Sequence, residues 1–165
     1  MATLPAGYPE DAFEAFALLK TRDELTVDDL KVLALIELYG ECFYQRLAAG
    51  VEHAEARALL ERNGAEERGH AHRVVKAIRL KSGEAYSLPE GADNPFMKLA
   101  PSAVPASAEL FGLLEQGEVD GDFAYQAWAD HESNAEVADL YRLNGREETR
   151  HGERVTEVRR LLGAL

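Results

Sequence analysis

A twelve-residue segment of this chain occurs twice. The first copy, NGAEERGHAHRV, begins at Asn63, and the second, NGREETRHGERV, begins 81 residues later at Asn144. Seven of the twelve positions are identical in the two copies. The same offset of 81 residues relates further pairs upstream: Glu37 and Glu118, Tyr44 and Tyr125. The repeat therefore predicts two similar halves, each with one Glu followed thirty residues later by a Glu-x-x-His motif.

Apolar periodicity and capping signals predict an all-α fold. A short helix is expected over residues 9–19, and Thr26 with Asp29 has the pattern of a capping box that starts a helix ending at Gly50. Further helices are expected over 54–81, over 107–130 and from an Asn134 cap to about 163. No segment alternates as a half-buried strand would.

The connection between the two halves is long. Residues 84–105 contain four prolines and no sustained helical period. Such a segment is too long for a tight hairpin and suits a crossover between two helix pairs. We therefore expect one domain over residues 1–165. It would be a ferritin-like four-helix bundle with one long crossover connection and a short extra N-terminal helix, and its repeated halves would be residues 27–81 and 107–163.

The repeated acids share helix faces with apolar residues. In the first and third long helices such a face carries two acids and a tyrosine: Glu37, Glu41 and Tyr44 in the first, Glu118, Asp122 and Tyr125 in the third. In the second and fourth it carries the repeated motif: Glu67 and His70, Glu148 and His151. Burial of four unpaired carboxylates is costly, so cations are expected between them. Carboxylates with one imidazole per ion suit iron or manganese.

Each part of this pattern also has a plain structural interpretation. A single Glu-x-x-His on a charged helix is usually solvated, but two copies, each with an upstream Glu on an apolar face, favour a site for two metal ions. Tyr44 and Tyr125 are either core aromatics or neighbours of the metals. Each lies seven residues after a candidate ligand, which favours contact with the site. Glu41 and Asp122 are expected to hydrogen-bond the ligands, with direct ligation as the alternative. These four residues are predicted to take part in catalysis.

Composition limits the partners and the compartment. Thirty acidic and eighteen basic residues give a net charge of −12, which disfavours nucleic acid and anionic membranes as partners. Cys42 is the only cysteine, so neither an intramolecular disulfide nor a Cys-x-x-Cys metal site is available. The N-terminal residues lack a basic start and an apolar run, so neither a signal peptide nor a membrane span is expected, and the cytoplasm is the expected compartment.

These motifs resemble the ferritin-like di-iron carboxylate superfamily, and within it the rubrerythrin and erythrin branch, over residues 27–162. The resemblance implies that Glu67 and Glu148 bridge two metals. It also implies that Glu37 and Glu118 are terminal carboxylates and that His70 and His151 are terminal imidazoles. Two features depart from rubrerythrins. One cysteine excludes their rubredoxin domain, and Gly121, next to Asp122, stands where they usually carry an extra metal-binding Glu.

The resemblance implies a di-iron oxidoreductase that reacts with O2 or peroxide and takes electrons from a donor that the sequence does not identify. The expected cofactor is two iron ions, with manganese or a mixed pair as the alternative. Three other functions stay open: a ferroxidase or iron-handling protein, an oxygenase with an organic substrate, and a bundle whose metals are only structural. Residues 84–105 are expected to form a lid, a dimer contact or a plain connector, and a homodimer is expected.

Overall fold

The computed structural model describes residues 2–98 and 104–163. Within these residues the chain is all-helical and has no strand. In chain order the elements are α1 (Ala12–Leu19), α2 (Val27–Ala49), α3 (Ala54–Ser82), the short 3-10 helices η1 (Gly91–Asp93) and η2 (Pro95–Lys98), α4 (Ala108–His131) and α5 (Ala135–Leu161). The predicted all-α class is confirmed.

Capping residues fix the ends of these helices. Thr26 and Asp29 form the expected capping box: Thr26 Oγ1 accepts from the Asp29 backbone N–H at 3.2 Å, and the Asp29 carboxylate accepts from the Thr26 N–H at 2.8 Å. Gly83 ends α3 with a φ of 73°, in the left-handed region that favours glycine. The first helix begins at Ala12, later than the expected Pro9, because the Asp11 side chain caps it.

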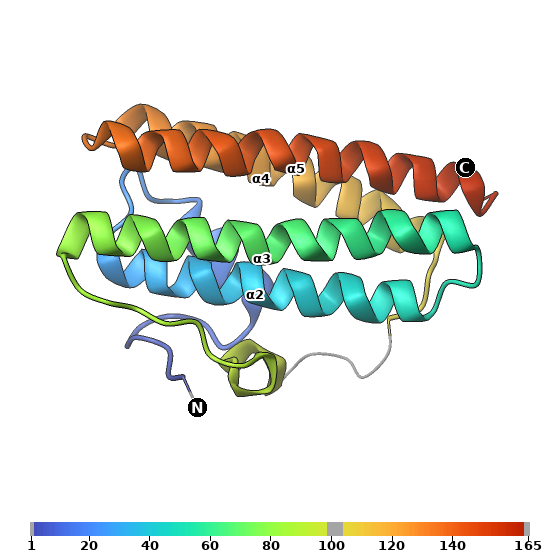
Figure 1. Cartoon of the computed structure of the whole chain (residues 1–165), viewed down its shortest axis with the longest axis horizontal. Coiled ribbons are helices and arrows are strands. Elements are labelled where there is room, and N and C mark those ends of the chain that lie inside the picture. Colours follow the sequence, from blue (N-terminus) through green and yellow to red (C-terminus); the bar gives the residue numbers. More distant parts are fainter. Residues whose placement is uncertain (1, 99–103, 164–165) are drawn as a thin grey trace.

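The four long helices pack as two antiparallel pairs, α2 with α3 and α4 with α5, and α3 packs against α5 to join the pairs (Figure 1). α1 lies against α2. Figure 1 shows that α3 and α4 run in the same direction along the molecule. The connection between them therefore has to return along the length of the helices. Part of it, η1 and η2, packs on α2. The rest of this connection includes residues 99–103, which lie outside the described residues.

Two apolar clusters occupy the two ends of the helix bundle. One contains Leu30, Leu33, Val74, Trp128 and Tyr141. The other contains Leu47, Leu60, Phe111, Val155 and Val158. Along every long helix the candidate metal ligands fall between the residues of these two clusters, so the acids of the repeat lie in a polar layer at mid-length. Among the described helices, none combines the length and the apolar character that crossing a membrane requires.

Candidate metal centre

All six predicted ligands meet in this polar layer. Glu37 comes from α2, Glu118 from α4, and the two Glu-x-x-His motifs from α3 and α5. Both imidazoles are fully buried, and none of the four carboxylates is more than 8 % exposed. The sequence pattern therefore placed these acids on the inner faces of their helices correctly, among the buried residues rather than in solvent.

The six side chains form two overlapping groups. One contains Glu37, Glu67, His70 and Glu148, and the other contains Glu67, Glu118, Glu148 and His151. In each group, one oxygen or nitrogen atom of every member lies within 4.8 Å of the others. Each group offers three carboxylates and one imidazole, and Glu67 and Glu148 belong to both. Such a donor set can hold metal ions, and the sharing of two carboxylates places the two groups side by side.

The two imidazoles present the same ring nitrogen to the centre. His70 Nδ1 lies 3.3 Å from Glu37 and 3.3 Å from Glu148, and His151 Nδ1 lies 3.3 Å from Glu67 and 3.3 Å from Glu148. The rings stack with their centroids 5.2 Å apart. Among the described residues, Nδ1 of His151 is buried and has no hydrogen-bond partner, although carboxylate oxygens lie this close. A cation between these oxygens and Nδ1 would satisfy that geometry.

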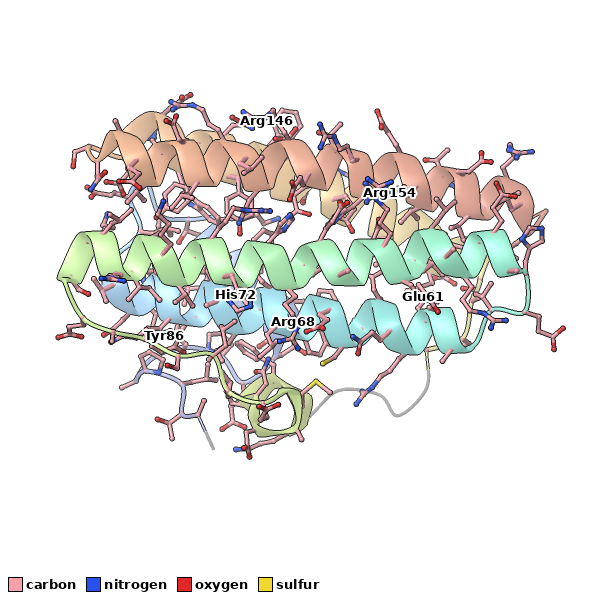
Figure 2. All side chains as sticks on the ribbon, viewed as in Figure 1. Glu61, Arg68, His72, Tyr86, Arg146 and Arg154 are labelled. Atoms are coloured by element: carbon pink, nitrogen blue, oxygen red, sulfur yellow. The ribbon has the colours of Figure 1, made fainter. Side chains whose placement is uncertain are left out.

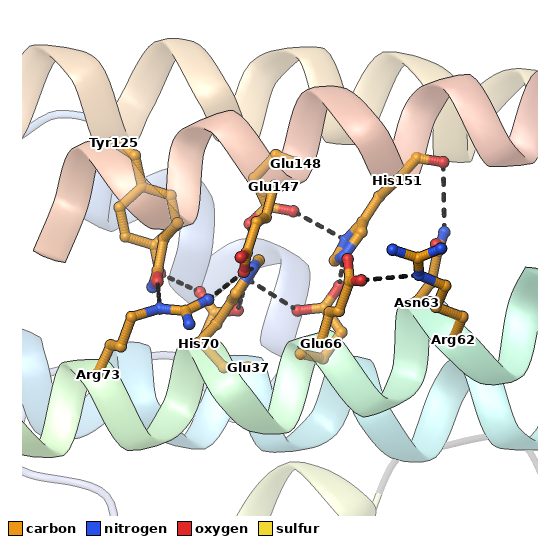
Figure 3. Close-up of polar contacts among 12 residues, drawn as sticks. Glu37, Arg62, Asn63, Glu66, His70, Arg73, Tyr125, Glu147, Glu148 and His151 are labelled. Carbon is orange, nitrogen blue, oxygen red and sulfur yellow. Dashed lines mark hydrogen bonds and ion pairs between the residues drawn. The ribbon is translucent and has the colours of Figure 1, made fainter.

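The other nitrogen of each imidazole faces a carboxylate outside the two groups (Figure 3). His70 Nε2 lies 3.2 Å from Glu147, and His151 Nε2 lies 3.3 Å from Glu66. A carboxylate at Nε2 favours the proton on that nitrogen and leaves Nδ1 free to bind a metal. Each carboxylate comes from the helix pair opposite to its histidine, so these contacts also join α3 to α5.

Two arginines hold these outer carboxylates. Arg154 reaches from α5 toward α3, where its guanidinium lies 2.7 Å from Glu66 (Figure 2), and Arg73 pairs with Glu147 in the same way. An asparagine accepts from each arginine: Asn63 from Arg154 at 2.9 Å and Asn144 from Arg73 at 2.5 Å. None of these six residues has a role that was predicted from the sequence. Their signal was present, because all six are identical positions of the repeat.

The two tyrosines contact carboxylates across the bundle. Tyr44 of α2 donates a hydrogen bond to Glu118 of α4, and Tyr125 of α4 donates one to Glu37 of α2. Burial, reinforced by the neighbouring carboxylates, raises the pKa of both phenols well above the usual value of 10. Both tyrosines are therefore neutral donors at physiological pH, and they fix the orientation of the two carboxylates that belong to only one group each.

Glu41 and Asp122 have other partners. The Glu41 carboxylate is buried and lies 2.8 Å from Arg68 and 3.1 Å from Gln45. Asp122 accepts from Thr149 at 2.6 Å and from Gln126 at 2.9 Å. Among the described contacts of these two acids, none reaches any of the six candidate ligands. The predicted hydrogen bonds from these acids to the ligands are therefore not among the described contacts, and their part in the site stays a prediction.

Burial and the neighbouring charges shift the pKa values of the side chains in the centre. Burial raises the pKa of Glu37 and of Glu118 to about 8. Burial also acts to raise the pKa of Glu148, but both imidazoles outweigh it and hold that pKa well below its usual range. The pKa of His70 and of His151 lies well above 6.5, because the surrounding carboxylates outweigh the opposing effect of burial. Cations can replace these protons.

Helix glycines leave space for two carboxylate side chains and for the close contact of two helices. A Cβ on Gly40 would lie 3.2 Å from the Glu67 carboxyl carbon, and one on Gly121 would lie 3.3 Å from Glu148 Cγ. These two glycines accommodate the carboxylates that belong to both groups. A Cβ on Gly145 would lie 2.7 Å from Asp122 Oδ1 and 3.1 Å from Tyr125 Cβ, so α4 and α5 approach closely there.

Comparison of the chain with models of protein families, with curated proteins and with solved structures found no match in any of the three. The residues and the geometry of the chain itself are therefore what indicates its function. The two overlapping groups of Glu and His residues are the clearest feature, because the repeat in the sequence predicts them and the folded structure brings them together.

Proposed function

We propose that this chain is a di-metal carboxylate protein with a ferritin-like four-helix bundle and a crossover between α3 and α4. Its two ions would be iron in the first place, and it would act as an oxidoreductase on O2 or peroxide. One observation carries the proposal: Glu67 and Glu148 belong to both ligand groups. Ions in the two groups would share these carboxylates and lie close together, as joint action on one small oxidant requires.

The residues present fit two divalent ions. Four buried carboxylates supply up to four negative charges, which two such ions would balance. Glu37 and His70 would complete one ion's ligand set, and Glu118 and His151 would complete the other's. Oxygen-rich sites with a single imidazole suit iron and manganese better than the soft, thiolate-preferring metals. The buried Nδ1 of His151, which lacks a hydrogen-bond partner among the described residues, is the most direct support for a cation at this position.

When bound, a pair of ferrous ions would supply two electrons to O2 or peroxide. The chain's own side chains prepare the site for that chemistry. The phenols of Tyr44 and Tyr125 stay protonated and hold Glu118 and Glu37 in place by hydrogen bonds. Glu66 and Glu147 orient the imidazoles. Along the helices, the polar layer lies between two apolar clusters.

Anaerobic loading with ferrous iron followed by exposure to O2, and separately to hydrogen peroxide, tests this function. The loaded chain is expected to consume either oxidant in a fixed ratio to iron and to develop near-ultraviolet absorbance. His72→Ala is the control, because His72 lies on the exposed side of α3 and should not change the reaction. A loaded chain that consumes neither oxidant would contradict the redox function and leave the metals a structural role.

A further inference from the structure

A cavity leads from the surface to the candidate metal centre. Its volume is about 350 Å³, and it lies between α1, α2 and α4. Its floor is formed by Glu37, Glu67, Glu118 and Glu148, the four carboxylates of the centre. The polar layer is therefore open on the α1 side of the bundle. A molecule in this cavity would lie directly against the candidate ligands.

The walls above this floor are mostly apolar. Phe13 and Phe16 of α1 line one side, Tyr39 and Phe43 of α2 another, and Leu113 of α4 a third. Phe13 and Leu113 are 63 % and 66 % exposed, so the mouth of the cavity is apolar as well. Concave apolar walls that converge on a few polar groups are the usual form of a site for small organic molecules.

Gly117 keeps the α4 wall open. It lies one turn from Leu113 and one turn from Gly121, in the middle of the helix face that lines the cavity. A Cβ at this position would have no atom within 4 Å. Glycine is unfavourable within a helix by about 1 kcal/mol relative to alanine, and neither packing nor backbone conformation requires it here. The space beside Gly117 is therefore available to a ligand.

The charges on the wall indicate the class of that ligand. Among the described lining residues outside the floor, Lys20 is the only cation, and it pairs with Asp120 at 2.9 Å. Lys20 also lies over the Phe16 ring, 5.5 Å from its centroid. An anionic ligand would find no free cation on this wall and would face the carboxylates of the floor. An uncharged ligand meets neither obstacle.

We propose that this cavity binds a neutral, apolar organic molecule, aromatic or aliphatic, roughly twice the size of benzene. The size follows from the volume, since a cavity of about 150 Å³ holds one benzene molecule. The identification of this molecule as a substrate of the centre rests on the proposed redox function, whereas its binding does not. The depth of the cavity favours a small molecule over a second copy of the chain, because a protein surface would cover Phe13 and Leu113 without reaching the carboxylates.

Equilibrium dialysis of the full-length chain with 2-naphthalenemethanol tests this proposal, and 2-naphthoate is the anionic probe of similar shape. The dialysis uses the metal-free chain, so that binding does not depend on metal. The blocking variant is Gly117→Phe. Its matched control is Gly112→Phe, because Gly112 lies on the same helix, also has open space around a Cβ and does not line the cavity. Size-exclusion chromatography with light scattering gives the mass of each variant.

The wild type is expected to bind one molecule of 2-naphthalenemethanol per chain and to bind 2-naphthoate at least about tenfold more weakly. Gly117→Phe should weaken binding of the neutral probe about tenfold or more, and Gly112→Phe should leave it within about twofold. Equal binding by wild type and Gly117→Phe, or tighter binding of 2-naphthoate, would overturn the proposal. A mass of Gly117→Phe that differs from the mass of the wild type would also overturn the proposal, because the cavity mouth would then be an interface between copies of the chain. Probe binding by a chain that takes up no metal would defeat the redox function alone.

Discussion

Each candidate histidine lies between the centre and an outer carboxylate. His70 has Glu147 at its Nε2, and His151 has Glu66, and each of these acids is held in turn by an arginine. The contact with His151, reinforced by Arg154, holds the pKa of Glu66 well below its usual range, so this outer carboxylate is ionised. An ionised carboxylate at Nε2 increases the basicity of Nδ1 and fixes the ring. The contact should therefore raise metal affinity without touching a metal.

Glu66→Gln and Glu147→Gln test this contact. Each change keeps the size of the side chain but removes the charge, so metal affinity should fall about 10- to 100-fold at the histidine concerned. Calorimetric titration with manganous or ferrous ion measures this metal affinity. Glu61→Gln is the control, since Glu61 is exposed on the same helix as Glu66. Affinities of the two variants within a factor of two of the wild type would show that the outer carboxylates only hold the helices together.

At the scale of single residues, the repeat was sufficient to identify the six candidate ligands. It was not sufficient to identify the outer carboxylates and arginines that orient the histidines. A ligand on an apolar face stands out because burial of an acid needs an explanation. Glu66 and Arg154 lie at the side of that face and look like ordinary surface charges in the sequence. Their contact joins residues far apart in the chain and on different helix pairs, which helical periodicity cannot show. Only the identity of these positions in both copies of the repeat marked them.

Among the helices, capping residues made the ends predictable. The second helix begins and ends where the Thr26 capping box and Gly50 predicted, because local hydrogen bonds decide these ends. The short helices η1 and η2 were not predicted. Their segment is held by a distant contact instead, in which the Asn94 side chain donates to the backbone carbonyl of Leu35 at 2.8 Å. Local sequence signals do not contain such a contact.

Asp29→Asn should destabilise the chain in a pH-dependent manner. Asp29 is buried, which raises its pKa, but hydrogen bonds from Thr26 and Tyr8 outweigh burial and lower the pKa below 3.8. Its stabilising contribution is therefore present above the pKa of the unfolded chain and is lost as the pH falls through the lower pKa of the folded chain. Urea unfolding should show a loss of about 1 kcal/mol at neutral pH that shrinks below about pH 4.

Asp28→Asn is the matched control for this prediction. Asp28 is the neighbouring residue in the first turn of α2, its side chain is 60 % exposed, and it pairs only with Lys31 at the surface. Surface pairs of this kind contribute little to stability. Equal losses in Asp28→Asn and Asp29→Asn, or a loss in Asp29→Asn that is the same at neutral and acid pH, would refute the role of the capping box.

Two glycines of the second helix pair should respond to alanine in opposite ways. At Gly145 a Cβ would lie 3.1 Å from Tyr125 Cβ, which is fixed to α4, and the Asp122 side chain would also have to move, so Gly145→Ala should cost about 1–3 kcal/mol. At Gly112 a Cβ meets nothing within 4 Å, so Gly112→Ala should stabilise α4 by up to about 1 kcal/mol. Thermal unfolding of both variants measures the difference. Stabilisation by Gly145→Ala would mean that the helices do not approach closely there.

In the molecule as a whole, the two halves are similar on their inner faces and differ on their outer faces. The contacts of the centre occur in pairs related by the offset of 81 residues, as in Tyr44 with Glu118 and Tyr125 with Glu37. On the outside the halves differ: Leu38 is fully buried, whereas Val119, its counterpart in the repeat, is 44 % exposed. Among the described residues, α1, η1 and η2 pack on α2 and have no counterpart on α4. The repeat could therefore predict the centre but not the covering of its surface.

The central claim is that Glu67 and Glu148 are shared by two metal ions in one chain. Elemental analysis of the chain after loading with ferrous iron and removal of loosely bound metal tests it most directly. The wild type and His72→Ala are expected to retain two ions per chain. Glu67→Ala and Glu148→Ala are each expected to lose the paired site, because each change removes a carboxylate from both ligand groups at once. Two ions per chain in Glu67→Ala and in Glu148→Ala would contradict the shared site.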